Sequence, residues 1–359
     1  MDNTKLKITK QYAEEFDKKC AQINAHGFLR FLTETDDKDV SILDLIEQLG
    51  RSISVSSHKK EKEIDLTEKE IKDIIKEFYG RFPRLKEDVE KILDNTHPNF
   101  IDENGNSTIH IERQKGGEVS TGSVGHSGRH KYLNLELHLN GSVNDLTTIA
   151  HELAHAVSAH HTKKIEAIKE NLPQEFDKLT HSSFARDCIV EIESHIIERL
   201  FNRFLMKKGI LNEEDVKAYE NGELISLLNE INLIREELDI IKQLSCPITE
   251  KSLTELVDKL YRDKNFRLIE RIKTMHDTNK NSKHMFRYVV GRVISSVWIK
   301  RYEECSTKEE KRKMLTTFEN YLSKTHKLDL DSACKKLLGQ DFTAAVEDYC
   351  LGTLNERKV

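Results

Sequence analysis

The sequence contains 359 residues, of which 33% are charged and 37% are apolar, and its formal net charge is −5. A chain of this length can form one large domain or two modest ones with a sizeable buried core. The small net charge and the even mixture of acids and bases argue against nucleic acid and against a membrane surface as partners. The high charged fraction and only four prolines favour amphipathic helices with solvated outer faces.

Cysteine usage and the absence of targeting signals bear on the cellular compartment. The six cysteines are scattered and form no C-x-x-C pair, which is typical of reduced thiols. No apolar run is long enough to span a bilayer, and the first residues contain no hydrophobic signal segment. We therefore expect a cytoplasmic protein, with export by a route that needs no N-terminal signal as the alternative.

The N-terminal part is predicted to form a helical segment and linker over residues 1–64, followed by a second domain over residues 65–359. Helical periodicity runs through residues 13–32 and 40–49, and the polar stretch 51–63 has no periodicity. A capping box, Thr67-Glu68-Lys69-Glu70, then predicts the start of a further helix. Residues 84–93 repeat the helical pattern, which ends before Pro98.

A small sheet is predicted between residues 99 and 141. Thr108–Glu112 and Tyr132–Leu139 alternate between apolar and polar residues as strands do. The glycine-rich stretch Thr121–Gly128 between them is predicted to be a mobile loop facing a cleft. It lacks the lysine of a phosphate-binding loop and precedes a strand, which excludes nucleotide binding there. The second strand should pass through Asn140-Gly141 into the next helix.

Almost everything after residue 142 has helical periodicity, so the predicted fold class is mainly α with a small β-sheet. The expected helices cover residues 147–169, 184–207, 213–244, 249–262, 285–302 and 308–322, with short helices to the end.

The first of these helices contains His151-Glu152-Leu153-Ala154-His155, an H-E-x-x-H motif. Ser142 or Asn144 can cap the helix, and apolar residues recur at helical spacing through the motif. Positions i and i+4 lie on one face of a helix, so both imidazoles point to one spot. Two such nitrogens suit a tetrahedral Zn²⁺, and Glu152 would lie beside the metal-bound water.

A third protein ligand is expected from the helix that contains Glu191, since hydrolytic zinc sites usually have three. Glu191 lies between apolar residues, where an unpaired carboxylate would be costly, although it can equally be a surface carboxylate. His195 is the alternative, and it would give a site of three histidines. Glu198, nearly two turns after Glu191, either orients a ligand or faces water.

The stretch Asn140–His155 resembles the active-site region of oligoendopeptidase F, a zinc metallopeptidase of the thimet-oligopeptidase type. Ile189-Val190-Glu191-Ile192-Glu193-Ser194 falls where that family carries its glutamate ligand. Tyr288-Val289-Val290-Gly291 is similar to the Tyr-x-x-Gly of a late helix in the family. The resemblance covers roughly residues 65–350 and is strongest at the H-E-x-x-H helix.

The resemblance implies a gluzincin-type helical metallopeptidase with a small sheet before the H-E-x-x-H helix. His151, His155 and Glu191 would bind one zinc ion per chain, and Glu152 would be the general base. A peptide or protein substrate would bind in an extended conformation along the strand Tyr132–Leu139.

The sequence departs from the family pattern in three respects. Ala154 stands where the family usually has glycine, and the long gap between His155 and Glu191 predicts an insertion around residues 165–180. The chain is also shorter than a family member at its N-terminal side, so residues 1–64 would be a reduced roof or an unrelated segment. A reduced roof would leave a more open cleft, to which a folded protein or a flexible loop could bind.

The family places a late histidine and a late tyrosine over the substrate, where they stabilise the oxyanion. His276, His284 and Tyr288 are the candidates in this sequence, with His284 near the usual tyrosine position. For Tyr288, a place in the core of an apolar helix is the alternative.

The predicted function is therefore that of a zinc-dependent endopeptidase. One alternative is a dedicated protease, of the secreted bacterial effector or toxin type, that cleaves one specific protein. The other is a catalytically retired helical binding or scaffold protein. Other conspicuous residues receive structural interpretations: His160 and His161 are expected on the surface, His110, His126, His130 and His138 in loops or on strand faces, and Cys188 and Trp298 in the core.

Overall fold

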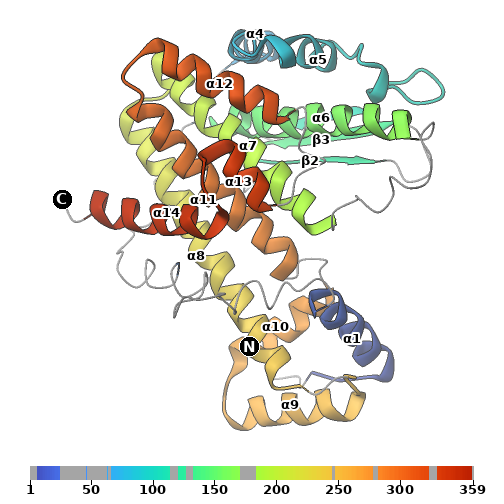
Figure 1. The fold of residues 1–359 in the computed structure, drawn as a ribbon. Coiled ribbons are helices and arrows are strands. Elements are labelled where there is room, and N and C mark those ends of the chain that lie inside the picture. The colour runs from blue at the N-terminus through green and yellow to red at the C-terminus, as the bar shows by residue number, and fades with distance from the viewer. Residues whose placement is uncertain are drawn as a thin grey trace. The chain divides into compact units, whose positions relative to one another are not determined.

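The computed structural model describes residues 6–24, 46, 63, 66–113, 120–126, 132–169, 183–244, 247–277, 282–322 and 330–357 of the chain. In these ranges the protein is mainly helical with one three-stranded sheet, as the sequence predicts (Figure 1). The elements are α1 (Lys10–Asn24), α4 (Glu68–Tyr79), α5 (Pro83–Leu93), η1 (Pro98–Phe100), β1 (Ile109–Arg113), β2 (Thr121–His126), β3 (Leu133–Leu139), α6 (Asn144–Lys169), α7 (Ser183–Lys207), α8 (Glu213–Lys242), α9 (Glu250–Arg262), α10 (Phe266–Asp277), α11 (Ser282–Glu304), α12 (Lys308–Leu322), α13 (Leu330–Leu338) and α14 (Phe342–Arg357).

The chain forms two compact units. The first, which we call the sheet unit, contains residues 56–222 and 291–345, and the second contains residues 1–55, 223–290 and 346–359. The domain boundary predicted between residues 64 and 65 stays a prediction. Apart from residue 46, the helix expected over residues 40–49 lies outside the described residues. Of the insertion predicted around residues 165–180, residues 165–169 continue α6 and the rest lies outside the described residues.

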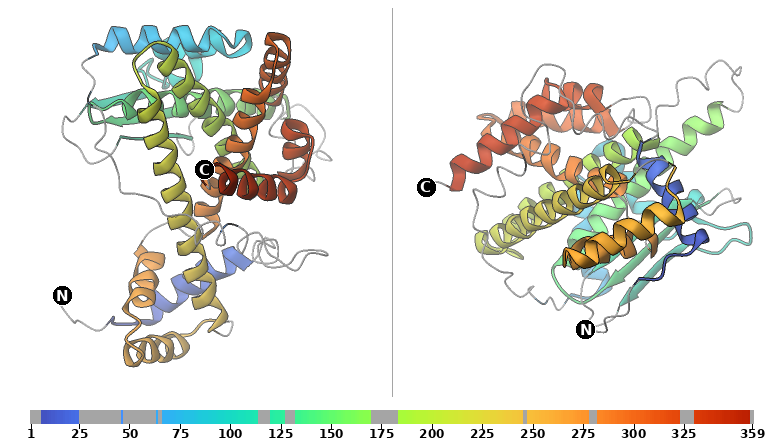
Figure 2. Two further views of the ribbon diagram at one scale, coloured as in Figure 1. Left: turned by 90° about the vertical axis from the view of Figure 1, so that its left-hand side faces the viewer. Right: turned by 90° about the horizontal axis from the view of Figure 1, so that it is seen from below.

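In the second unit, the N-terminal helix α1 packs against α9 and α10 (Figure 2). The main-chain N–H of Leu6 donates to the hydroxyl of Tyr261 over 3.0 Å, and the hydroxyl of Tyr12 donates to the carbonyl of Ile272 over 3.1 Å. Asp17 accepts a hydrogen bond of 2.7 Å from the main-chain N–H of Ile248. The start of the chain is thus attached to helices that come more than 200 residues later.

In the sheet unit, the strand order is β1-β3-β2. β3 is central: it pairs in parallel with β1 and antiparallel with β2. The four leucines at positions 133, 135, 137 and 139 are buried and the residues between them are more exposed, so the alternation predicted for this strand is confirmed.

The central place of β3 corrects the predicted mode of substrate binding. Both edges of Tyr132–Leu139 are occupied by neighbouring strands, so no extended peptide can add to it. In the described part of the chain, β1 and β2 are the two edge strands of the sheet.

The stretch predicted to be a mobile loop is also corrected, because Thr121–His126 forms β2. The prediction of a loop rested on the two glycines of this stretch, which weaken a strand in isolation. Pairing with β3 from Thr121↔His138 to His126↔Leu133 supplies the hydrogen bonds that local propensity does not favour.

The turn between β3 and α6 sets the direction of the H-E-x-x-H helix. Gly141 has φ of 89°, a left-handed conformation that glycine adopts without strain. The buried carboxylate of Asp145 accepts hydrogen bonds from the main-chain N–H groups of Asn140 (2.9 Å) and Gly141 (3.0 Å) and from the hydroxyl of Ser120 (2.6 Å). These contacts fasten the first turn of α6 to the sheet.

Helix α6 lies between the α4–α5 pair and the sheet, and it packs along α7 (Figure 1). The capping box predicted at Thr67 and Glu70 is present at the start of α4. At the other end of α4, the hydroxyl of Tyr79 donates to the carbonyl of Ala150 over 2.8 Å, directly before His151. Among the described residues, no helix is long and apolar enough to cross a membrane.

Candidate metal centre

The two histidines of the H-E-x-x-H motif face each other on α6. The Nε2 atoms of His151 and His155 lie 3.1 Å apart, and their rings are nearly perpendicular, with centroids separated by 4.8 Å. Leu153 and Ala154 between them are buried, so the packed side of the helix is apolar. The helical spacing therefore presents two nitrogen atoms to one point, as the sequence predicts.

The third side chain at this point is Glu191, from α7. Its Oε2 atom lies 3.7 Å from the Nε2 atom of His151 and 3.7 Å from that of His155. The side chain is buried, which excludes the surface position considered from the sequence. The edges of a tetrahedral zinc site with bonds of 2.0–2.1 Å are about 3.4 Å long. Separations of 3.1–3.7 Å between donor atoms therefore fit such an ion.

His195, the alternative third ligand, is buried, and its ring faces Glu198. Its Nδ1 atom lies 3.2 Å from Oε2 of Glu198, one turn further along α7. Its ring centroid lies 5.2 Å from that of His151. The structure thus brings Glu191, and not His195, to the Nε2 atoms of both motif histidines.

Glu198 orients the first histidine, which is one of the two roles considered from the sequence. Its Oε2 atom lies 3.0 Å from Nδ1 of His151, and its Oε1 atom accepts a hydrogen bond from the hydroxyl of Tyr219. When Nδ1 of His151 donates to this carboxylate, the lone pair of Nε2 faces His155 and Glu191.

The charges around His151 shift the pKa values of two side chains, those of His151 and Glu198. Burial alone lowers the pKa of His151, but the hydrogen bond to Glu198 and the charges of Glu198, Glu191 and Glu152 outweigh burial and raise it to about 9. Burial alone raises the pKa of Glu198, but hydrogen bonds from His151 and His195 hold it well below its usual value. The cluster thus favours an ionised Glu198 that faces a cation.

Glu152 lies against the edge strand of the sheet. Its side chain is 7% exposed, and its Oε2 atom is buried without a hydrogen-bond partner among the described residues. A Cβ atom at Gly122 of β2 would lie 2.4 Å from Cγ of Glu152. Only glycine at position 122 leaves room for this carboxylate, a constraint that sequence reasoning missed because it assigned the stretch to a loop.

A second glycine makes a close contact with α7 beside Glu191. A Cβ atom at Gly291 of α11 would lie 2.5 Å from Cδ2 of His195 and 3.0 Å from the main-chain oxygen of Glu191. Gly291 is the glycine of the Tyr-x-x-Gly motif noted in the sequence. It allows α11 to approach the backbone that carries Glu191.

The three residues expected to stabilise the oxyanion belong to the second unit, so their roles stay predictions. The hydroxyl of Tyr288 accepts a hydrogen bond of 2.7 Å from Arg287, whose guanidinium also lies over the tyrosine ring. The side chains of His276 and His284 lie outside the described residues.

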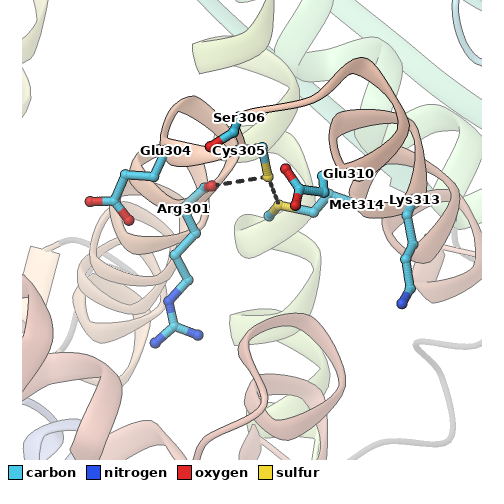
Figure 3. Close-up of a pocket in the computed structure, with 7 residues that line it drawn as sticks. All are labelled: Arg301, Glu304, Cys305, Ser306, Glu310, Lys313 and Met314. Atoms are coloured by element: carbon cyan, nitrogen blue, oxygen red, sulfur yellow. Dashed lines mark hydrogen bonds between the residues drawn. The ribbon is translucent and has the colours of Figure 1, made fainter.

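A pocket of about 400 Å³ lies between the end of α11 and the start of α12 (Figure 3). The Sγ atom of Cys305 lies 3.3 Å from the carbonyl of Arg301 and 3.4 Å from Sδ of Met314. None of the residues that line this pocket belongs to the candidate metal centre; they are Arg301, Glu304, Cys305, Ser306, Glu310, Lys313 and Met314.

Comparison with known proteins identifies the fold. No protein-family model matches the sequence, and no curated protein matches it. Two solved structures resemble the chain at 12% identity and cover 96% of it: a provisionally assigned oligoendopeptidase F from Bacillus anthracis str. Ames, with a TM-score of 0.50, and PZ peptidase A with an inhibitor, with a TM-score of 0.51. The match spans 55% and 57% of those two chains. The protein thus has an oligoendopeptidase F-like fold, as the sequence resemblance implies, and the likeness extends beyond residues 65–350.

The contact at Gly291 predicts an unusual response to a helix-favouring substitution. Alanine normally stabilises a helix relative to glycine by about 1 kcal/mol. Gly291→Ala is expected instead to destabilise the protein by about 1–3 kcal/mol, because the new methyl group overlaps His195 and the backbone of Glu191. The matched control is Gly222→Ala in α8, where a Cβ atom meets nothing within 4 Å and the normal stabilisation is expected. Thermal unfolding of both variants measures the two signs, and equal shifts would contradict the close approach.

Proposed function

We propose that the chain is a zinc-dependent endopeptidase in which His151, His155 and Glu191 bind one zinc ion and Glu152 is the general base. The observation that carries the proposal is the convergence of two imidazole nitrogens and a carboxylate oxygen within 4.8 Å of one another. Two histidines and a glutamate are a common set of protein ligands in hydrolytic zinc sites, in which water or substrate takes the fourth position. The oligoendopeptidase F-like fold supports the same function.

The mechanism follows from the position of Glu152. Zinc at this site would polarise a peptide carbonyl and lower the pKa of a water molecule. Glu152 follows His151 directly, and its charge acts on that imidazole. Its carboxylate accepts the proton of the attacking water and passes it to the nitrogen of the leaving amine. Gly122 keeps the carboxylate close to the sheet edge, beside which the substrate binds.

The edge strand β2 is the proposed binding place for an extended peptide substrate. β2 pairs with β3 along one side, and Gly122 places it in contact with Glu152. An extended peptide that adds to the other side of β2 gains main-chain hydrogen bonds and passes the general base. We therefore assign the substrate-binding strand to Thr121–His126 in place of Tyr132–Leu139.

A first experiment tests the enzyme directly. Glu152→Gln keeps the shape of the side chain but cannot accept the proton, so we expect peptide cleavage to fall by about 10²- to 10⁴-fold. Zinc uptake from a single equivalent should be unchanged. The measurement is cleavage of a diverse peptide pool by mass spectrometry beside metal analysis, with the exposed Glu213→Gln as the control.

The outcomes separate the proposed function from its rivals. Cleavage that persists in Glu152→Gln would contradict the role of Glu152. Zinc uptake without cleavage by the unmodified protein would favour a protease for one specific protein or a retired binding protein. An unmodified protein that takes up no zinc would contradict the metal centre itself.

A second experiment tests how the metal ligand is held. Glu198→Gln removes the charge that faces His151, and substitutions of such supporting groups typically lower metal affinity by about 10- to 100-fold. We expect a loss in this range when the protein competes for zinc with a chromogenic chelator. Glu213→Gln should leave the affinity unchanged, and an unchanged affinity in Glu198→Gln would show that the contact has no part in metal binding.

A further inference from the structure

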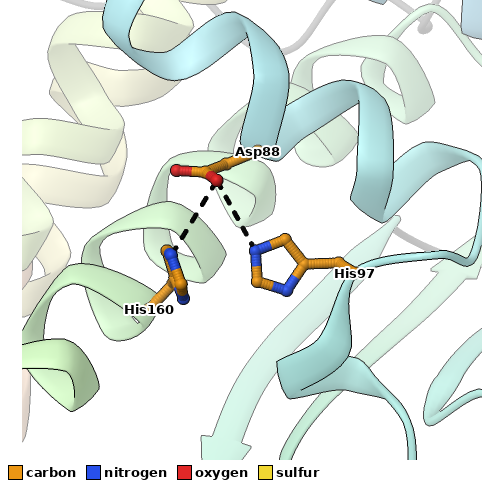
Figure 4. Close-up of side chains that lie close together, drawn as sticks. All are labelled: Asp88, His97 and His160. Carbon is orange, nitrogen blue, oxygen red and sulfur yellow. Dashed lines mark ion pairs between the residues drawn. The ribbon is translucent and has the colours of Figure 1, made fainter.

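A second group of metal-ligating side chains lies on the opposite side of α6 from His151. His160 comes nine residues after His151, which places it about 180° around the helix axis. It meets His97, from the turn before η1, and Asp88, from α5 (Figure 4). Both imidazole rings point toward the carboxylate of Asp88. The group shares no residue with the candidate metal centre described above.

The distances between the side chains of this group match those in the candidate metal centre. The Oδ1 atom of Asp88 lies 3.7 Å from Nε2 of His97 and 3.8 Å from Nε2 of His160. At the first centre, the carboxylate of Glu191 lies 3.7 Å from each of its two imidazoles. These separations are longer than a hydrogen bond but suit an ion held between the donors.

The burial of the group also favours a bound ion. His97 is 1% exposed and His160 is 6% exposed, so the expectation that His160 lies on the surface is wrong. Their ring centroids lie 4.5 Å apart, with the planes almost perpendicular. The carboxylate of Asp88 is 15% exposed, which gives an ion and a water molecule access from that side.

We propose that Asp88, His97 and His160 form a second site for a divalent transition metal such as zinc. Two imidazoles and one carboxylate suit this class of ion better than they suit calcium or magnesium, which prefer oxygen ligands. The site binds α5 and the turn at His97 to the second half of α6. Its role is structural: it fixes the helix that carries the H-E-x-x-H motif at a point beyond that motif.

Asn99 contacts both imidazoles of this site. Its Nδ2 atom lies 2.7 Å from Nδ1 of His160, an orientation that favours a proton on Nε2. Rotation of the amide by 180° would turn its oxygen to a proton on Nδ1 and leave Nε2 free for a metal. Its main-chain N–H donates to Nδ1 of His97 over 3.2 Å, which favours a proton on Nε2 of His97. A metal at that nitrogen displaces the proton and the hydrogen bond. The second site therefore binds zinc more weakly than the first.

The test is a calorimetric titration of the metal-stripped full-length protein with zinc chloride. The proposal predicts two equivalents, the second weaker than the first. Asp88→Asn should lower the affinity of the second equivalent by at least about tenfold and leave the first unchanged. Asp94→Asn is the matched control, because Asp94 is exposed and pairs with Lys76 at the end of α5. His155→Gln should have the opposite effect, with loss of the first equivalent and retention of the second.

Thermal unfolding supplies an independent readout. Excess zinc should raise the midpoint of His155→Gln further than that of the double variant His155→Gln/Asp88→Asn, because only the former keeps the second site. A single equivalent that His155→Gln abolishes would overturn the proposal, whereas a single equivalent that survives His155→Gln would contradict the peptidase centre instead. A second equivalent that is unaffected by Asp88→Asn would also overturn it, while leaving the proposed peptidase centre intact.

Discussion

The hydrogen-bonded pair of His151 and Glu198 is the interaction on which the candidate metal centre depends. Their side chains are only 15% and 12% exposed, and at this depth an ionised carboxylate is costly unless several donors surround it. His195 and Tyr219 provide the further contacts. With Nδ1 of His151 held in this way, Nε2 is the nitrogen that faces Glu191, so the pair selects the tautomer that a metal requires.

The same pair contributes to the charge balance of the centre. Glu191 and Glu198 are seven residues apart and thus lie on one face of α7, which packs against the histidines of α6. Burial lowers the pKa of His151, but the hydrogen bond to Glu198 and the charges of the nearby carboxylates outweigh burial and raise it. His151, His155 and Glu191 would hold a metal that takes the place of a proton on His151 and supplies the positive charge that two buried carboxylates require. The packing of α6 on α7 therefore fixes both the positions of the candidate ligands and the charges around them.

Local pattern predicted the parts of this centre that lie on one helix. His151 and His155 follow from helical periodicity, because i and i+4 always share a face. Spacing alone leaves both Glu191 and His195 as candidates, because the sequence of one helix does not show how it packs against another. The family resemblance is what favours Glu191. The stretch around Gly122 is wrongly predicted to be a loop. Glycine is required at position 122 because the carboxylate of Glu152, from another element, packs against it. His160 was misread because its partners lie over 60 residues earlier in the chain.

The central claim is that two imidazoles and one carboxylate hold a single ion at the H-E-x-x-H helix. Zinc K-edge X-ray absorption tests it most directly, with one equivalent of zinc and with Asp88→Asn in every protein compared, so that the second site does not take up the ion. The account predicts four nitrogen and oxygen donors at about 2.0–2.1 Å, with two imidazoles among them, and a changed spectrum in His155→Gln. A six-coordinate oxygen shell, sulfur among the ligands, or a spectrum that His155→Gln leaves unaltered would contradict it.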